Sequence, residues 1–213
     1  MTDDIKSRIL FAVENDGDPR LGESIYRRKD LQCTSCHAIA GAGGRVGPDL
    51  VSIGASAQDD YLLESIIEPN KKVKENFHST IILDVDGQVI SGIPIREDDQ
   101  TLVIRNPKDE IRSIPKATIE ARREGRSLMP DGGVDLLTEK EIVHLLRFLS
   151  ELGEPGEFAV GTREFARRWQ FLRNTPESRF KLRRTSYDSV VQEDPAYQWA
   201  AAYSEVSGLI PVT

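Results

Sequence analysis

The sequence predicts a mainly α protein with a small antiparallel β insertion and a C-terminal extension. Apolar residues recur at helical spacing in several segments of the first three quarters of the chain, whereas residues 76–122 alternate between apolar and polar side chains. Glycine and proline separate these segments. We therefore expect a helical domain over residues 1–156 with its β-rich insertion at 76–122. Residues 157–213 form a helical or irregular extension that can belong to a following domain.

The composition is that of a soluble globular protein. Of the 213 residues, 38% are hydrophobic and 30% are charged. No apolar run approaches the roughly 20 residues that a membrane-spanning helix needs, and the net charge of −7 argues against broad nucleic-acid binding. The two cysteines stand three positions apart, which excludes a disulfide framework.

Two short helices are expected before the cysteines. Residues 3–13 form the first, and an Asn-Asp-Gly-Asp-Pro stretch at 15–19 ends it. Apolar side chains then recur at helical spacing over 20–30, a segment that runs directly into the cysteine motif. The glycine-rich stretch 38–48 that follows the motif is expected to be a loop.

Two further helices are expected on either side of the insertion. The helix over 56–68 has Ser56 as its cap and ends at Pro69. The helix over 138–152 begins at Thr138 with a Thr-x-x-Glu capping box.

The stretch 76–122 predicts four or five short strands in a small barrel or curled sheet. Apolar runs separated by turn residues lie at 79–83, 88–91, 101–104 and 111–114, and Asp86-Gly87 is a strong hairpin signal. None of the runs supplies a favoured ligand. We therefore expect a module that the helical core can partly do without.

The extension contains a helical pattern near 162–173, with Phe165, Trp169 and Leu172 on one face. Arginines and lysines alternate with aromatic residues between 163 and 184. This pattern occurs in proteins that bind single-stranded nucleic acid. Packing on a neighbouring domain or an acidic partner is the favoured interpretation here.

The strongest chemical motif is Cys33-Thr-Ser-Cys36-His37. Two cysteines three apart at the start of a helix project to one side, at the separation of the two haem vinyl groups, and the adjacent histidine turns toward the iron. A thioredoxin-like redox pair needs a preceding strand, and a zinc site needs four ligands. A helix precedes this motif and there is no second cysteine pair. Chance occurrence in a loop is the remaining alternative to a covalent haem.

Met129 is the candidate for the second axial ligand. A lone methionine more often fills a gap in the core. Met129, however, is the only methionine besides the initiator and stands beside Pro130 in a glycine-flanked loop. Thioether sulfur is the usual partner of histidine in electron-carrying haem. His78 is a weaker competitor for this position, and His144 is expected at the surface.

The motifs together resemble a known family, the haem-binding cytochrome c domain found in large exported proteins of planctomycetes and verrucomicrobia. The resemblance covers about Arg20 to Gly156. Three segments carry it: Cys33-Thr-Ser-Cys-His-Ala-Ile-Ala-Gly-Ala-Gly-Gly-Arg-Val-Gly-Pro-Asp-Leu50, Tyr61-Leu-Leu-Glu-Ser-Ile-Ile-Glu-Pro-Asn70 and Ser127-Leu-Met-Pro130. It implies a cytochrome c-like helical core around one haem, interrupted by a β-rich insertion.

Two further cofactor-binding residues are expected from this resemblance and from the position of the loop. Pro48 stands where monohaem cytochromes c place the backbone carbonyl that accepts a hydrogen bond from the ligating histidine. Arg45 is the nearest candidate to neutralise a haem propionate, with a solvated loop arginine as the alternative.

The expected function is single-electron transfer rather than enzymatic catalysis, with a redox partner protein or a fused dehydrogenase domain as donor. Because this haem is attached outside the cytoplasm and the amino terminus has no secretory pattern, we expect a fragment or processed form of an exported, periplasmic protein. Neither nucleic acid nor a membrane span is expected. A peroxidase-like haem enzyme and a haem-based sensor with a displaceable sixth ligand stay open as alternatives.

Overall fold

The computed structural model describes residues 1–160, 165–183, 195 and 197–210. The chain divides into two compact units, Met1–Gly161 and Thr162–Thr213. Of the described residues, 34% lie in helices and 23% in strands. The expected mainly α, cytochrome c-like fold class is therefore wrong. The chain has a mixed α and β fold, because its antiparallel five-stranded sheet is a large element with a hydrophobic core of its own.

Helices α1 (Asp3–Asp16) and α2 (Pro19–Tyr26) open the first unit. The Asp18 carboxylate caps α2 by accepting hydrogen bonds from the N–H groups of Arg20 and Leu21, at 2.9 and 3.3 Å. Pro19 fits the first turn because its missing N–H would have no partner in the helix. Capping of this kind depends only on neighbouring residues.

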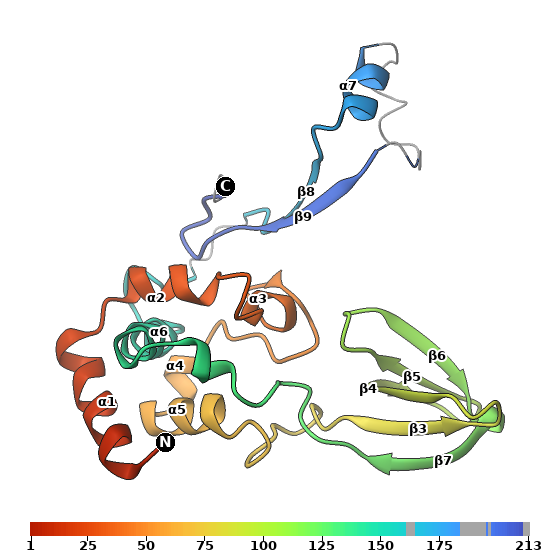
Figure 1. Cartoon of the computed structure of the whole chain (residues 1–213), viewed down its shortest axis with the longest axis horizontal. Coiled ribbons are helices and arrows are strands. Elements are labelled where there is room, and N and C mark those ends of the chain that lie inside the picture. The colour runs from red at the N-terminus through yellow and green to blue at the C-terminus, as the bar shows by residue number, and fades with distance from the viewer. Residues whose placement is uncertain (161–164, 184–194, 196, 211–213) are drawn as a thin grey trace. The chain divides into compact units, whose positions relative to one another are not determined.

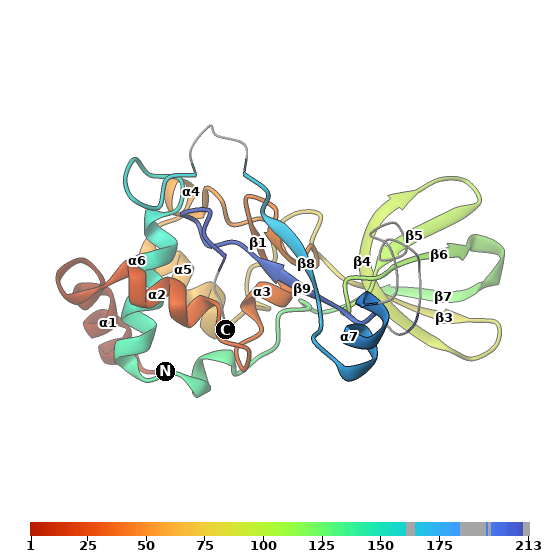
Figure 2. The ribbon, with the colours of Figure 1, turned by 90° about the horizontal axis from the view of Figure 1, so that it is seen from above.

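Helix α2 crosses α6 (Glu139–Glu151) at very short range, as Figures 1 and 2 show. A Cβ atom at Gly22 would lie 2.0 Å from the carbonyl oxygen of His144 and 2.5 Å from Cβ of Phe148. The rings of Tyr26 and Phe148 follow in the same contact, with centroids 5.8 Å apart. The crossing therefore requires glycine at position 22.

Helices α4 (Ile53–Ser56) and α5 (Asp59–Ile67) replace the single helix expected over 56–68. Two residues with extended backbone separate them, so Ser56 ends a helix instead of starting one. A Cβ at Gly54 would lie 2.1 Å from the carbonyl oxygen of Ser150, which shows how closely α4 approaches the end of α6.

The cysteine motif forms its own turn, α3 (Cys33–Cys36). The loop expected after it contains a miniature hairpin of strands β1 (Ala38–Ile39) and β2 (Ala42–Gly43). Further along, a short 3-10 turn, η2 (Gly133–Leu136), precedes α6.

The sheet of the first unit has the strand order β6-β5-β4-β3-β7, with all pairs antiparallel. Asp86 and Gly87 make the tight turn between β3 and β4, and Gly87 has φ 77°. A short 3-10 turn, η1 (Lys116–Thr118), leads into the last strand. The strands are β3 (Thr80–Asp84), β4 (Val89–Glu97), β5 (Thr101–Arg105), β6 (Ile111–Pro115) and β7 (Ile119–Glu124).

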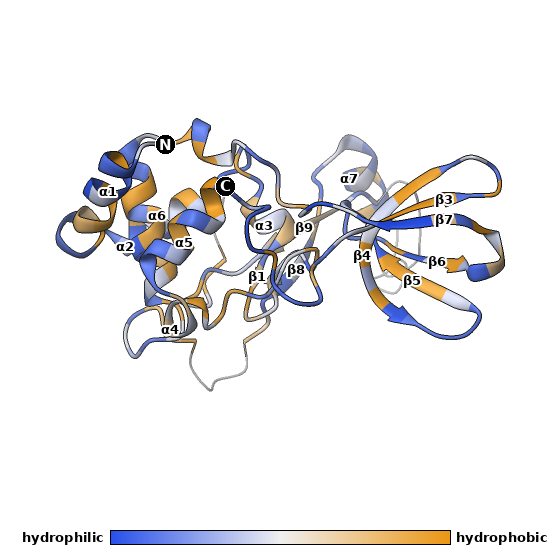
Figure 3. Ribbon diagram, turned by 90° about the horizontal axis from the view of Figure 1, so that it is seen from below, coloured by the Kyte–Doolittle hydropathy of each residue, from blue (hydrophilic) through white to orange (hydrophobic). Residues whose placement is uncertain are grey.

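One face of the sheet holds a small core of Ile82, Leu102, Ile104 and Ile114, all buried. Strand β7, at the edge, is almost wholly exposed and hydrophilic, as Figure 3 shows. Charged side chains on an edge strand discourage pairing with other chains.

The second unit is a two-stranded ribbon of β8 (Arg168–Leu172) and β9 (Trp199–Tyr203), with helix α7 (Pro176–Leu182) between them in sequence. The helix expected near 162–173 is therefore wrong over 168–172, and residues 162–164 lie outside the described part of the chain. Pairing with a strand that lies far along the chain overrides the local helical pattern here.

Across the described residues, no helix is both long enough and apolar enough to cross a membrane.

Candidate functional site

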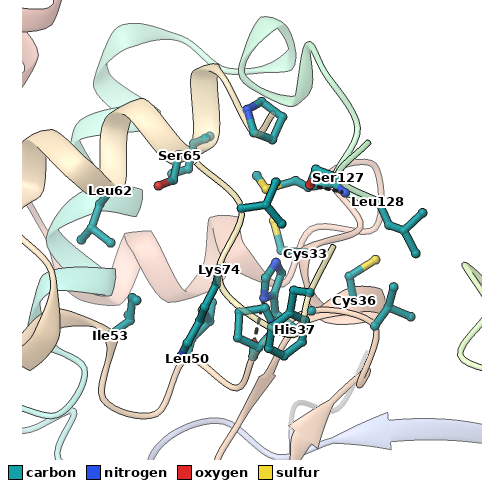
Figure 4. Close-up of a pocket in the computed structure, with 18 of the residues that line it drawn as sticks. Cys33, Cys36, His37, Leu50, Ile53, Leu62, Ser65, Lys74, Ser127 and Leu128 are labelled. Carbon is teal, nitrogen blue, oxygen red and sulfur yellow. Dashed lines mark hydrogen bonds between the residues drawn. The ribbon is translucent and has the colours of Figure 1, made fainter. Parts of the chain in front are cut away.

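A cavity in the first unit brings together the residues that carry the sequence motifs. Cys33, Cys36, His37, Pro48 and Met129 all line it. Figure 4 shows Cys33, Cys36 and His37 together with Leu62 and Ser65 of α5 and with Ser127 and Leu128 of the later loop. Most of the other lining side chains are apolar, including Leu50, Ile53, Leu62, Ile66, Leu145 and Leu149. The space among the lining residues is about 1200 Å³, which includes the part open to solvent.

Local hydrogen bonds shape the turn that presents the two cysteines. The N–H of His37 donates to the carbonyl oxygen of Cys33 at 2.8 Å, which closes the α3 turn. The N–H groups of Gly44 and Gly47 donate to the carbonyl oxygens of Thr34 and Cys36, at 2.8 and 2.7 Å. The glycine-rich stretch is thus folded tightly onto the cysteine turn.

The His37 imidazole is held in one orientation. Its Nδ1 lies 2.9 Å from the carbonyl oxygen of Pro48. A carbonyl oxygen only accepts hydrogen bonds, so Nδ1 carries the proton and Nε2 keeps a free lone pair. Burial lowers the pKa of His37, against smaller opposing effects of the Pro48 bond and Asp49, and so favours the neutral ring. A neutral imidazole with one nitrogen anchored is suited to bind a metal ion through the other.

The backbone of Gly47 packs against one face of the His37 ring. A Cβ atom at position 47 would lie 2.5 Å from Cε1 of His37 and 2.7 Å from Nδ1. The hydroxyl of Tyr26, on α2, donates to the carbonyl oxygen of His37 at 2.8 Å. Sequence reasoning did not assign Tyr26 to the site, because this contact joins two elements whose relative position only the tertiary structure sets.

Both cysteines are free thiols and half-buried. Burial raises the pKa of Cys33 to about 11 and raises that of Cys36 as well. Reactive cysteines in redox pairs have lowered pKa values and stand in electropositive surroundings. This environment therefore disfavours a thioredoxin-like redox pair.

Met129 reaches the cavity from the loop between β7 and η2 and is half-buried. Its N–H donates to the hydroxyl oxygen of Ser127 at 3.1 Å. At the start of this loop, the N–H of Gly125 donates to the carbonyl oxygen of Ser79 at 2.8 Å, and the Ser79 hydroxyl donates to the carbonyl oxygen of Arg126. The loop is thereby tied to the beginning of β3.

Arg45, the expected partner of a haem propionate, lies outside the cavity lining, and its role toward a propionate stays a prediction. Arg45 is exposed and does not line the cavity, and its N–H donates to the Asp109 carboxylate at 3.2 Å. The cationic side chains that do line the cavity are Lys72 and Lys74. A signal for them was present in the sequence as the basic run that follows Pro69 and Asn70.

The two other histidines have different surroundings. His78 is exposed, does not line the cavity, and has Nδ1 3.1 Å from the Glu124 carboxylate. The expectation that His144 is a surface residue is wrong, since only 6% of it is exposed. Its Nδ1 accepts a hydrogen bond of 3.0 Å from the N–H of Asp18. His144 links α6 to the cap of α2 and has a packing role.

The sheet contributes to the site, which the sequence did not indicate. Ile93 of β4 lines the cavity and is 4% exposed. Asp109, in the turn between β5 and β6, accepts the Arg45 N–H and pairs with Arg105 at 2.5 Å. Ile93 and Asp109 thus connect the sheet to the cavity wall and to the loop after the cysteines, and the expectation that the helical core can partly do without 76–122 stays a prediction.

Within the described residues, no group of three or more histidine, cysteine, aspartate or glutamate side chains could hold a metal ion. The chain matches no protein-family model, and it matches no curated protein sequence.

Proposed function

We propose that this protein carries one covalently bound c-type haem and transfers single electrons. Cys33 and Cys36 are the proposed attachment points, and His37 and Met129 are the proposed axial ligands. The observation that supports this most strongly is that the Cys33–His37 motif and Met129, which are far apart in the sequence, line one largely apolar cavity.

The chemistry of the cavity fits the group. Two neutral thiols stand one helical turn apart on one wall, beside an imidazole whose Nε2 is free to bind iron. A single soft thioether sulfur is contributed by Met129. The apolar walls suit a flat, largely apolar macrocycle, and Lys72 and Lys74 offer positive charge for its carboxylates.

When bound, the haem supplies an iron centre that cycles between two oxidation states. The protein's own residues bind and orient it. The Pro48 carbonyl fixes the His37 ring and makes its free nitrogen a better donor. A methionine sulfur as the second ligand favours a higher reduction potential than a second histidine would. The apolar side chains limit the access of water, which also tunes the potential.

Two further proposals follow from covalent attachment. We propose that the protein matures outside the cytoplasm, where such attachment takes place. We also propose that its electron donor or acceptor is a redox partner protein or a linked dehydrogenase domain. Reduction of the purified protein by candidate donors tests the second proposal.

Mass spectrometry tests the attachment directly. Protein matured in a host that exports c-type cytochromes should have the mass of the chain plus one haem, and the haem should survive acid-acetone extraction. Cys33→Ser or Cys36→Ser should leave the haem loosely held or missing. Ser35→Ala, which changes one of the two residues between them, should keep it attached. A haem-free mass for the matured wild type would contradict the proposal.

Spectroscopy tests the second ligand. The oxidised protein should show the weak near-infrared band of a sulfur-to-iron bond. Met129→Ala should abolish this band, lower the potential and let carbon monoxide bind the reduced protein. His78→Ala is the matched control and should change none of these. The opposite result for the two variants would make His78 the ligand and the protein a low-potential bis-histidine cytochrome.

A further inference from the structure

Asn70 joins two points of the loop that carries Met129. Its Oδ1 accepts a hydrogen bond of 3.0 Å from the N–H of Ser127, and its Nδ2 donates one of 3.0 Å to the carboxylate of Asp131. A backbone N–H only donates and a carboxylate only accepts, so the two partners fix the orientation of the amide. One side chain thus holds the residues two positions before and two positions after Met129.

We call the hydrogen bonds from Asn70 to Ser127 and Asp131 the Asn70 bridge. The backbone at Asn70 is held in place by its neighbour. Asn70 directly follows Pro69, which is buried and lines the cavity just beyond the end of α5. The proline ring restricts the backbone at this point. Asn70 therefore links the helix on one wall of the cavity to the loop on another.

The bridge continues to the methionine itself. The Ser127 residue whose N–H is held by Asn70 accepts, through its hydroxyl oxygen, the N–H of Met129 at 3.1 Å. On the far side, Gly132 has φ 82°, and a chain turn follows Asp131. Without the Asn70 bonds, the segment from Ser127 to Asp131 would lose the side chain that fixes its two ends relative to α5.

We propose that Asn70 is a positioning residue that keeps the Met129 sulfur in place as the second axial ligand. This inference rests on the proposed haem function. The chemistry demands an amide at position 70, because the site needs one acceptor and one donor on the same short side chain. An aspartate would keep the acceptor but would place a second carboxylate against Asp131.

Exchange of the two partners tests the bridge in the haem-loaded protein. Asn70→Asp should weaken the near-infrared sulfur band and speed carbon monoxide binding to the reduced protein about tenfold, the factor that corresponds to 1.4 kcal/mol. The double substitution Asn70→Asp with Asp131→Asn restores a donor and an acceptor across the same gap. It should return both readouts close to the wild-type values.

Two reference variants separate the outcomes. Asn15→Ala removes a side-chain hydrogen bond to the carbonyl oxygen of Phe11, at the end of α1, and should leave the band and the carbon monoxide rate unchanged. Met129→Ala sets the full effect of losing the ligand. The role of Asn70 is refuted, and the ligand assignment kept, if Met129→Ala abolishes the band while Asn70→Asp has no effect. The same holds if the double substitution does not restore the band and the carbon monoxide rate. If Met129→Ala leaves the band intact, the ligand assignment fails and the role of Asn70 with it.

Discussion

Replacement of Gly47 by alanine should displace the His37 ring. The added Cβ would lie 2.5 Å from Cε1 of His37, which is 0.5 Å shorter than the 3.0 Å at which Cβ contacts in proteins begin. Gly47 does not have a positive φ, so the substitution acts through this contact rather than through backbone strain. The ring has to move away from the Gly47 backbone.

The expected loss of unfolding free energy has two sources: compression of the new Cβ against the His37 ring, and weakening of the hydrogen bond from that ring to Pro48. Overpacking at a rigid site costs about 1–3 kcal/mol. A ring displaced by several tenths of an ångström also weakens the 2.9 Å bond from Nδ1 to the Pro48 carbonyl oxygen, and a lost hydrogen bond of this kind costs about 0.5–1.5 kcal/mol. The haem-loaded variant should therefore lose about 1.5–4.5 kcal/mol of unfolding free energy.

Denaturant unfolding and the visible spectrum measure these effects together. The thioether bonds do not involve the imidazole, so the haem should stay attached in Gly47→Ala while the spectrum changes toward a weakly ligated iron. Gly133→Ala is the control, since a Cβ there would meet nothing within 4 Å. An unchanged spectrum and an unchanged unfolding midpoint in Gly47→Ala would refute the placement of the ring.

Three further predictions concern packing and protonation. Gly22→Ala should destabilise the protein by up to about 2 kcal/mol, because overpacking against α6 exceeds the roughly 1 kcal/mol that alanine gains in a helix. A stabilised variant in thermal melts would contradict the α2–α6 crossing. Ile93→Ala should cost about 2–5 kcal/mol in denaturant unfolding and let carbon monoxide bind faster, if the sheet closes the cavity; an effect on neither would show that the sheet is separable. In haem-free protein, the lowered pKa of His37 means that the folded state binds a proton less readily than the unfolded chain. The haem-free protein should therefore keep its full unfolding free energy above about pH 6.5 and lose part of it as the pH falls below that value. His37→Gln should remove the part of this loss that comes from His37.

Local patterns in the sequence were enough to predict several elements of the fold. The capping box of Thr138 and Glu141 starts α6, and Asp86 with Gly87 makes the hairpin turn. Both depend on residues a few positions apart. The spacing of Cys33, Cys36 and His37 likewise needs only one helical turn to bring these side chains to one side.

The failures share a physical cause, which is that the deciding contact is remote in sequence. The ribbon at 168–172 follows strand pairing with β9 rather than its own helical period. His144 is buried because α2 covers it, although its helical position suggested solvent. The fold class was wrong because alternation reveals strands but not whether a sheet has a core of its own.

The residue types of the candidate site can be read from the linear chain: two thiols and an imidazole at fixed spacing, and a single methionine in a later loop. Which other residues join them depends on how the chain folds. The tertiary structure placed Ile93 and the two cavity lysines at the walls, left Arg45 outside, and set Asn70 across the Met129 loop. Chemistry carried by neighbouring residues is visible in a linear chain, whereas the walls of a cavity come from segments that meet only when burial of apolar surface brings them together.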